Sequence, residues 1–217
     1  MSGEQPGFFI SFEGGDGAGK STQIKLLAER LQKTGHEVIV TREPGGSPGG
    51  EMIRALLVSG DKDRWSPMTE ALLMIAARRD HLEKTILPAL ARGAVVITDR
   101  FADSTMAYQG LAGDLGYETV AQLHQIAIGG QEPELTVILD VPIEEGLKRA
   151  GDRSGNETRF ESKGAEYQAR VRDAFTEIAR NNPNRCVIIP ASDAIEIVAD
   201  AIWRALSVRM PGLFNTG

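Results

Sequence analysis

The sequence predicts a doubly wound α/β fold in three layers, with a five-stranded parallel sheet between helices. Five short runs of β-branched and aromatic residues recur along the chain, and each is almost continuously apolar, as is typical of strands buried on both faces. Segments with helical periodicity separate these runs, which favours parallel strands joined by crossover helices. The chain has 217 residues, 41% of them hydrophobic, so we expect a single domain over residues 1–217.

The expected strands share a feature at their ends. They are FFISFE (8–13), EVIVTR (37–42), AVVITD (94–99), LTVILD (135–140) and CVIIPA (186–191). Four of the five end in polar residues, namely Glu13, Arg42 with Glu43, Asp99 with Arg100, and Asp140. Doubly wound folds bind their ligands at the carboxyl ends of the strands, so we expect the functional site there.

The expected helices cover residues 21–35, 69–93, 118–130, 142–150 and 193–209. Gly35 is suited to the C-terminal cap of the first. Pro88 should interrupt the second, which stops at Gly93, and Ser192 or Asp193 should introduce the last.

Two segments break the alternation of strands and helices. Residues 43–51 (EPGGSPGGE) predict a turn rich in proline and glycine after the second strand. Residues 151–164 are polar, contain glycine and are flanked by helices. We interpret the region around 150–163 as a short lid over the site, with a plain surface loop as the alternative.

The charge balance restricts the partners that the chain could bind. Its 24 basic and 30 acidic residues give a net charge of −6, which argues against a nucleic-acid footprint and against a membrane-surface patch. The single cysteine, Cys186, lies in an apolar run and is expected to be buried and inert. The first residues lack the pattern of a secretory signal, and no apolar stretch approaches about 18 residues, so we expect a cytoplasmic protein.

The strongest motif is GGDGAGKST (14–22), which follows the first expected strand and fits the phosphate-loop pattern Gly-x4-Gly-Lys-Ser/Thr. Backbone N–H groups of such a loop and of the helix that follows it point at phosphate oxygens. Lys20 would reach the β- and γ-phosphates of a nucleotide, and Ser21 would ligate Mg²⁺. The residues assigned to phosphate binding are Gly14, Gly15, Asp16, Gly17, Ala18, Gly19, Lys20, Ser21 and Thr22.

The phosphate loop alone does not decide between a GTPase switch, a motor ATPase and a small-molecule kinase. The Asn-Lys-x-Asp motif of switch GTPases is absent from the sequence. Asp99 could be a catalytic carboxylate, but Arg100 follows it directly, as would suit a second anionic substrate. Arg42 and Arg100 stand at equivalent strand ends and favour a phosphate site. For Arg78, helical spacing leaves two interpretations open, a snorkelling side chain or a base-reading donor.

Several motifs together resemble the bacterial thymidylate kinases, a family of nucleoside-monophosphate kinases with a phosphate loop. The motifs are FEGGDGAGKST, TREPGG, AARRDHL, DRFADSTMAYQG and LDVPIEEGLKR, and their order and separation cover nearly the whole chain. The resemblance implies phosphorylation of dTMP to dTDP with MgATP, on a five-stranded core and as a homodimer.

The resemblance also implies roles for individual residues. Asp16 would accept a hydrogen bond from the 3′-hydroxyl of dTMP, Arg42 and Arg100 would hold its phosphate, and Arg78 would read the thymine edge. Asp99 would lie near Mg²⁺ with Ser21. The base and the deoxy sugar would meet a wall formed by Ser104, Tyr108 and Gln109. Cationic groups near the transferring phosphoryl and on the ATP side would come from Arg149, Arg153 and Arg159.

Two positions depart from the usual family pattern. Some members carry an arginine directly after the acidic loop residue, where this chain has Gly17, so the resemblance implies that the lid supplies this charge, Arg153 first and Arg159 second. The aromatic residue that usually stacks on thymine is replaced by Met74, a less rigid platform. Alternative functions are another nucleotide or nucleoside kinase, such as one preferring dUMP, and an ATPase switch protein. A nucleoside kinase would not need the clamp of Arg42 and Arg100.

Overall fold

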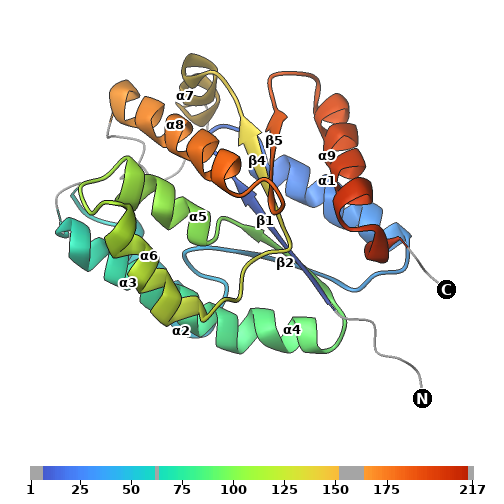
Figure 1. Ribbon diagram of the computed structural model, residues 1–217, viewed down its shortest axis with the longest axis horizontal. Coiled ribbons are helices and arrows are strands. Elements are labelled where there is room, and N and C mark those ends of the chain that lie inside the picture. Colours follow the sequence, from blue (N-terminus) through green and yellow to red (C-terminus); the bar gives the residue numbers. More distant parts are fainter. Residues whose placement is uncertain (1–6, 62–63, 152–163, 215–217) are drawn as a thin grey trace.

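The computed structural model describes residues 7–61, 64–151 and 164–214. Within them, five strands form one sheet in the order β2-β3-β1-β4-β5, and every pairing is parallel (Figure 1). The strands are β1 (Phe8–Glu13), β2 (Val38–Arg42), β3 (Val95–Asp99), β4 (Leu135–Asp140) and β5 (Cys186–Pro190). The predicted fold class and all five predicted strands are confirmed, with ends that differ by at most one residue.

The register of the sheet brings the polar strand ends together. Phe12 of β1 is level with Asp99 of β3, and Asp99 is level with Arg42 of β2. On the other side, Glu13 is level with Ile138 of β4. The end of β1, where the phosphate loop begins, therefore lies between the ends of β3 and β4.

Helices connect the strands and follow the last one. They are α1 (Lys20–Lys33), α2 (Pro48–Val58), α3 (Pro67–His81), α4 (Leu87–Ala91), α5 (Ala102–Thr105), α6 (Tyr117–Ile128), α7 (Ile143–Gly151), α8 (Ala165–Asn181) and α9 (Ile195–Arg209). Two π-helical segments, Leu82–Ile86 and Met106–Leu111, and a 3₁₀ turn, Pro211–Leu213, complete the described elements. None of the described helices is both long and apolar enough to span a membrane.

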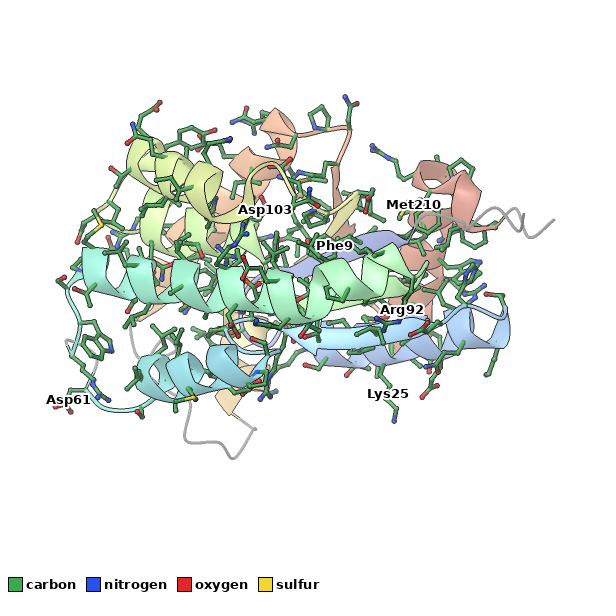
Figure 2. All side chains as sticks on the ribbon, turned by 90° about the horizontal axis from the view of Figure 1, so that it is seen from below. Phe9, Lys25, Asp61, Arg92, Asp103 and Met210 are labelled. Carbon is green, nitrogen blue, oxygen red and sulfur yellow. The ribbon has the colours of Figure 1, made fainter. Side chains whose placement is uncertain are left out.

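The sheet has a separate hydrophobic core on each face. On one face, side chains such as Ile10 and Phe12 of β1 pack with residues of α1 and α9. On the other, Phe9 packs with α3, α4 and the segments that follow them, while α8 covers the part nearer β4 and β5. Figure 2 shows Phe9 beside the layer of α3 and α4, whereas Lys25 on α1 points away from the body of the molecule. Successive β1 residues thus pack into the cores on opposite faces of the sheet, so the fold has three layers, with the sheet between two layers of helices.

The prediction of a simple turn over residues 43–51 is wrong, because α2 begins inside this segment. Ser47 caps the helix, since its hydroxyl accepts a hydrogen bond from the Gly50 N–H at 3.1 Å. Pro48 occupies the first helical turn, where its missing N–H is not needed. A Cβ on Gly49 would lie 2.7 Å from a carboxylate oxygen of Asp80 on α3, so the absent side chain permits close packing of the two helices.

The long helix predicted over residues 69–93 is interrupted near Pro88, as expected. The interruption takes the form of the π-helical segment Leu82–Ile86, after which Pro88 lies in the first turn of α4. Proline cannot donate to the preceding turn, and the wider π-helical turn accommodates this gap. The cap predicted for the last helix is wrong: α9 begins after Ala194 without a side-chain cap, and the Ser192 hydroxyl donates instead to Glu145 Oε2 at 2.8 Å.

Besides α2, two further helical regions were not among the predicted helices. The helix α8 contributes Tyr167, Val171 and Phe175 to the core, and it follows the polar segment 151–164. The helix α5 and the π-helical segment after it lie in DRFADSTMAYQG, which the sequence analysis treated only as a binding motif. Cys186 is buried, as expected, and burial raises the pKa of its thiol to about 12.

Candidate active site

The phosphate loop joins β1 to α1 through glycines with backbone angles that disfavour other residues. Gly17 and Gly19 have φ angles of 77° and 90°, in the left-handed region. Gly17 also approaches α7 so closely that a Cβ would lie 2.0 Å from the carbonyl oxygen of Gly146. The loop therefore curls at the N-terminus of α1, where backbone N–H groups and the helix dipole favour an anion.

Lys20 points back across this loop. Its Nζ donates to the carbonyl oxygens of Gly14 and Gly15 at 3.1 and 3.0 Å, and its side chain is buried. Burial, and then the positive charge of Arg100, lower the pKa of Lys20 to about 8. Among the residues that the structure describes, no carboxylate contacts the ammonium directly, and a polyphosphate would supply the missing negative charge.

Ser21 and Asp99 meet at the end of β3. The Ser21 hydroxyl donates to Asp99 Oδ2 at 3.3 Å, while Asp99 Oδ1 is buried and has no hydrogen-bond partner among the described residues. A buried carboxylate oxygen without a partner is costly unless a cation or water satisfies it. Mg²⁺ commonly binds one or two protein oxygens together with substrate phosphates, so this pair fits the metal predicted from the sequence.

Arg100 links the phosphate loop to the segment after β3. Its φ angle is 69°, a left-handed conformation that is uncommon for a residue with a side chain. The guanidinium donates to Asp16 Oδ1 at 2.7 Å, to the Ser104 hydroxyl at 3.0 Å and to the Tyr108 hydroxyl at 3.2 Å. Burial raises the pKa of Tyr108, so its hydroxyl keeps its proton.

Glu13 holds this segment from behind. Its carboxylate accepts hydrogen bonds from the Phe101 N–H at 2.7 Å and from the Ser104 hydroxyl at 2.5 Å, and the residue is fully buried. Burial, and then the carboxylate of Asp103, raise the pKa of Glu13 to about 8. We infer that Glu13 supports the strained backbone at Arg100 without itself lining the cavity.

A cavity of about 360 Å³ opens next to the phosphate loop. It brings together most of the predicted site residues. Those that line it are Asp16, Gly17, Ala18, Gly19, Lys20, Ser21, Arg42, Met74, Arg78, Asp99, Arg100, Ser104, Tyr108 and Gln109. Arg42 is 55% exposed at its rim and forms an ion pair with Glu51 on α2. Arg54 of α2 also lines the cavity, and its guanidinium donates to the Pro44 carbonyl oxygen at 2.7 Å.

Arg78 also lines this cavity and is only 2% exposed, so it is not a snorkelling side chain. Its Nε donates to Glu43 Oε2 at 2.7 Å, and another nitrogen donates to the Phe101 carbonyl oxygen at 2.9 Å and the Thr105 hydroxyl at 3.0 Å. The remaining nitrogen lies 3.3 Å from His124 Nε2. Burial, and then Arg78 itself, lower the pKa of His124 to about 3, so this ring is neutral.

Gln109 lines the same cavity as Arg78. Its amide Nε2 donates to Glu70 Oε1 on α3 at 2.8 Å, and both side chains are buried. Met74 is on α3 as well, one helical turn after Glu70. Residues of α3 and of the segment after β3 therefore line the cavity together.

Some predicted site residues lie elsewhere. Arg149 on α7 pairs with Glu145 and donates to the Ala191 carbonyl oxygen at 3.1 Å, outside the cavity. Thr22 is exposed on α1, and Gly14 and Gly15 line a smaller cavity under α7. Arg153 and Arg159 lie outside the described residues, as does nearly all of the expected lid around 150–163.

The sequence analysis missed the roles of three buried acids in or behind the cavity wall. Glu13 and Glu43 were noted only as polar strand ends, and Glu43 also as part of a turn, while Glu70 was not considered. A carboxylate in a run such as FFISFE carries a signal, because unpaired acids are rarely buried. The pairing of Glu70 with Gln109 has no such signal, because the two residues are 39 positions apart. Because helix α2 was not predicted, the place of Arg54 in the cavity wall was not predicted either.

The fold and the cavity define a phosphate-loop kinase of the nucleoside-monophosphate type. Comparisons with known proteins identify the family. Residues 12–202 match the family model described as "Thymidylate kinase". The chain is 61% identical over 196 residues to the thymidylate kinase of Caulobacter vibrioides, covering 90% of this chain and 94% of that protein.

Two further comparisons agree. The thymidylate kinase of Dinoroseobacter shibae is 56% identical over 200 residues, covering 91% of this chain and 96% of that one. A crystal structure of thymidylate kinase from Ehrlichia chaffeensis superposes with a TM-score of 0.77 at 35% identity, covering 93% of this chain and 99% of that one. The chain therefore belongs to the thymidylate kinase family.

Proposed function

We propose that the protein transfers the γ-phosphoryl group of MgATP to the phosphate of dTMP, which yields ADP and dTDP. Membership of the thymidylate kinase family supports this reaction. The observation that carries it in the structure is a single cavity lined by the phosphate loop, by Arg42 and Arg100, and by Arg78 and Gln109. A nucleotide acceptor needs cations for its phosphate and a donor and an acceptor for its base, and the lining of the cavity includes all of them.

On the donor side, the loop amides and Lys20 would bind the ATP phosphates. Phosphoryl transfer needs charge neutralisation and alignment more than covalent chemistry, so a fixed ammonium and aligned N–H groups would provide much of the catalysis. Ser21 and Asp99 would hold Mg²⁺, which would neutralise charge on the transferring phosphoryl group when bound. The partnerless oxygen of Asp99 supports this assignment.

On the acceptor side, Arg42 and Arg100 would hold the phosphate of dTMP. Asp16 would accept a hydrogen bond from the sugar 3′-hydroxyl, and its contact with Arg100 would keep it on that side of the loop. Arg78 would donate to the thymine edge, and the wall of Ser104, Tyr108 and Gln109 would enclose base and sugar. Met74 would pack against the base through its polarizable sulfur.

The remaining charge would come from the lid. Gly17 carries no side chain, so the arginine that some relatives have in the loop would be replaced by Arg153 or Arg159, with Arg149 towards the ATP side. An arginine over the γ-phosphate typically contributes about 10³ or more to kcat. The location of the protein in the cytoplasm stays a prediction from the sequence.

We further propose that the protein is a homodimer. Exposed apolar side chains occur in pairs one helical turn apart, Met52 and Leu56 on α2, and Met68 and Leu72 on α3, and these two helices pack against each other. Ile126 on α6, which contacts α3, is also exposed. Neighbouring exposed apolar groups of this kind are typical of a surface that a second copy covers.

A coupled ADP-release assay tests the reaction. With MgATP and a panel of dTMP, dUMP, dCMP, UMP and thymidine, we expect the highest kcat/KM for dTMP and no turnover of thymidine. Turnover of thymidine would favour a nucleoside kinase, for which a phosphate clamp is unnecessary. ADP release without any acceptor would favour a hydrolysing switch protein. Either result, or inactivity with dTMP, would overturn the proposal.

A further inference from the structure

We propose that Glu70 is a positioning residue that sets the base specificity of this enzyme, because it fixes which end of the Gln109 amide faces the acceptor cavity. The inference rests on the proposed function, in which a pyrimidine nucleotide occupies that cavity. Glu70 lies on α3, and Gln109 lies in the π-helical segment Met106–Leu111 after α5. Their side chains meet behind the cavity wall, where Gln109 Nε2 donates to Glu70 Oε1 at 2.8 Å.

The chemistry of the two groups allows one orientation of the amide. An ionised carboxylate only accepts hydrogen bonds, whereas an amide has an NH₂ end that donates and an oxygen end that accepts. The amide must therefore turn its NH₂ end towards Glu70. Glu70 lies in the first turn of α3, where the positive end of the helix dipole favours a negative charge.

The other end of the amide is consequently directed away from Glu70. Gln109 lines the acceptor cavity, and among the described residues no group donates a hydrogen bond to its Oε1. Any oxygen that is fully buried and has no hydrogen-bond partner would count as an unsatisfied polar atom, and in the described part of the chain Gln109 Oε1 is not one of these. This oxygen is therefore accessible and not enclosed by protein. The geometry thus presents a hydrogen-bond acceptor, Gln109 Oε1, to the cavity.

Arg78 lines the same cavity with the opposite polarity. Guanidinium nitrogens only donate, and the guanidinium is held by Glu43, Phe101 and Thr105. The cavity therefore offers both a fixed donor and an acceptor whose polarity depends on Glu70. Thymine and uracil carry an acceptor, O4, next to a donor, N3–H, whereas cytosine carries the reverse, an N4 amino donor next to the acceptor N3. Glu70 would therefore select for thymine and uracil and against cytosine.

The test replaces Glu70 by its amide in the full-length enzyme. Glu70→Gln keeps size and shape but can donate as well as accept, so the Gln109 amide can turn over. With saturating MgATP, we expect kcat/KM to fall for dTMP and to rise for dCMP, so that their ratio decreases about tenfold or more. The ratio between dTMP and dUMP should not change, because both bases present the same N3–H and O4 edge.

Two further variants separate positioning from simple support of the fold. Glu70→Asp keeps the charge but shortens the side chain, so it should loosen the amide and shift the dTMP to dCMP ratio in the same direction. Gln109→Leu removes the amide, and Glu70→Gln added to it should then leave that ratio unchanged. Thermal unfolding of each variant shows that it is folded.

Several outcomes would overturn the inference. Equal losses of kcat/KM for dTMP, dUMP and dCMP in Glu70→Gln would mean that Glu70 only supports the wall. An effect on selectivity that persists in the Gln109→Leu background would mean that Glu70 acts through another group. Inactivity of the unmutated enzyme towards dTMP would instead refute the proposed function, which the first assay of the series detects.

Discussion

Single residues at this site have conformations that depend on partners distant in sequence, and Arg100 is the clearest case. Its left-handed backbone would be strained in isolation, yet it places one guanidinium against Asp16, Ser104 and Tyr108 together. The carboxylate of Glu13 holds the following residue, Phe101, by accepting a hydrogen bond from the Phe101 N–H. A substitution at Glu13 should consequently weaken the hold that we propose Arg100 to have on the acceptor phosphate, although Glu13 does not line the cavity.

At the residue scale, the lowered pKa of Lys20 predicts how ATP binding depends on pH. The ammonium is charged below about pH 8 and neutral above it, so the affinity for ATP should be constant at lower pH and fall by up to about tenfold per pH unit above it. Calorimetric titration with ATP, without acceptor, from pH 7 to 9.5 measures this. Bound phosphates would raise the pKa of Lys20, so binding near pH 8 to 9 should also take up protons.

Lys20→Arg is the matched control for this prediction. Arginine stays charged throughout the range, so the variant should bind ATP more weakly but without the loss above pH 8. An equally steep loss in Lys20→Arg would assign the pH dependence to another group, and Glu13, with its pKa near 8, would be the first candidate.

At the scale of elements, the strands and the phosphate loop could be predicted from the sequence, whereas α2 and the rear of the cavity could not. Runs such as AVVITD identify buried strands because few other structures tolerate continuous apolar stretches. The glycines and proline of α2 suggest a turn. Pro48 is tolerated because it lies in the first helical turn, and the packing against Asp80 shows why position 49 is a glycine. Arg78 could be singled out, but Glu43, which orients it, could not, because that contact spans 35 residues.

The contact between the phosphate loop and α7 yields the second prediction. Gly17→Ala would put a Cβ 2.0 Å from the Gly146 carbonyl oxygen in an unfavourable backbone conformation, at a cost of about 1–3 kcal/mol. We expect the unfolding temperature to fall by several degrees and the KM for ATP to rise. Gly15→Ala is the control for stability, because nothing lies within 4 Å of its added Cβ. Equal unfolding temperatures of the two variants would contradict this account.

At the scale of the whole molecule, the apolar side chains on α2 and α3 connect assembly with the acceptor site. The same two helices carry Arg54, Met74 and Arg78 on their cavity side. A second subunit packed on the exposed side would therefore restrict movements of the wall that we propose to contact dTMP. The two termini of the described chain lie on another side of the molecule (Figure 1).

Leu72→Glu should disrupt the proposed dimer, because the new charge would be buried between subunits without a partner. Sedimentation equilibrium should find two subunits for the unmutated protein and one for this variant, with a raised KM for dTMP. Val208→Glu is the control, since Val208 is 77% exposed on α9, across the sheet, and its exchange should leave the subunit number unchanged. A monomeric unmutated protein would refute the proposed dimer.

The close approach of Gly17 to Gly146 also bears on how this chain could evolve. Some relatives carry an arginine directly after the acidic residue of the loop, where this chain has Gly17. The two kinds of loop differ by a single exchange at this position. Here that exchange would drive a side chain into the backbone of α7, so its first effect would be loss of stability. A lineage with this packing can gain an arginine at position 17 only after α7 has shifted. Descent from this sequence should therefore tend to preserve glycine at this position.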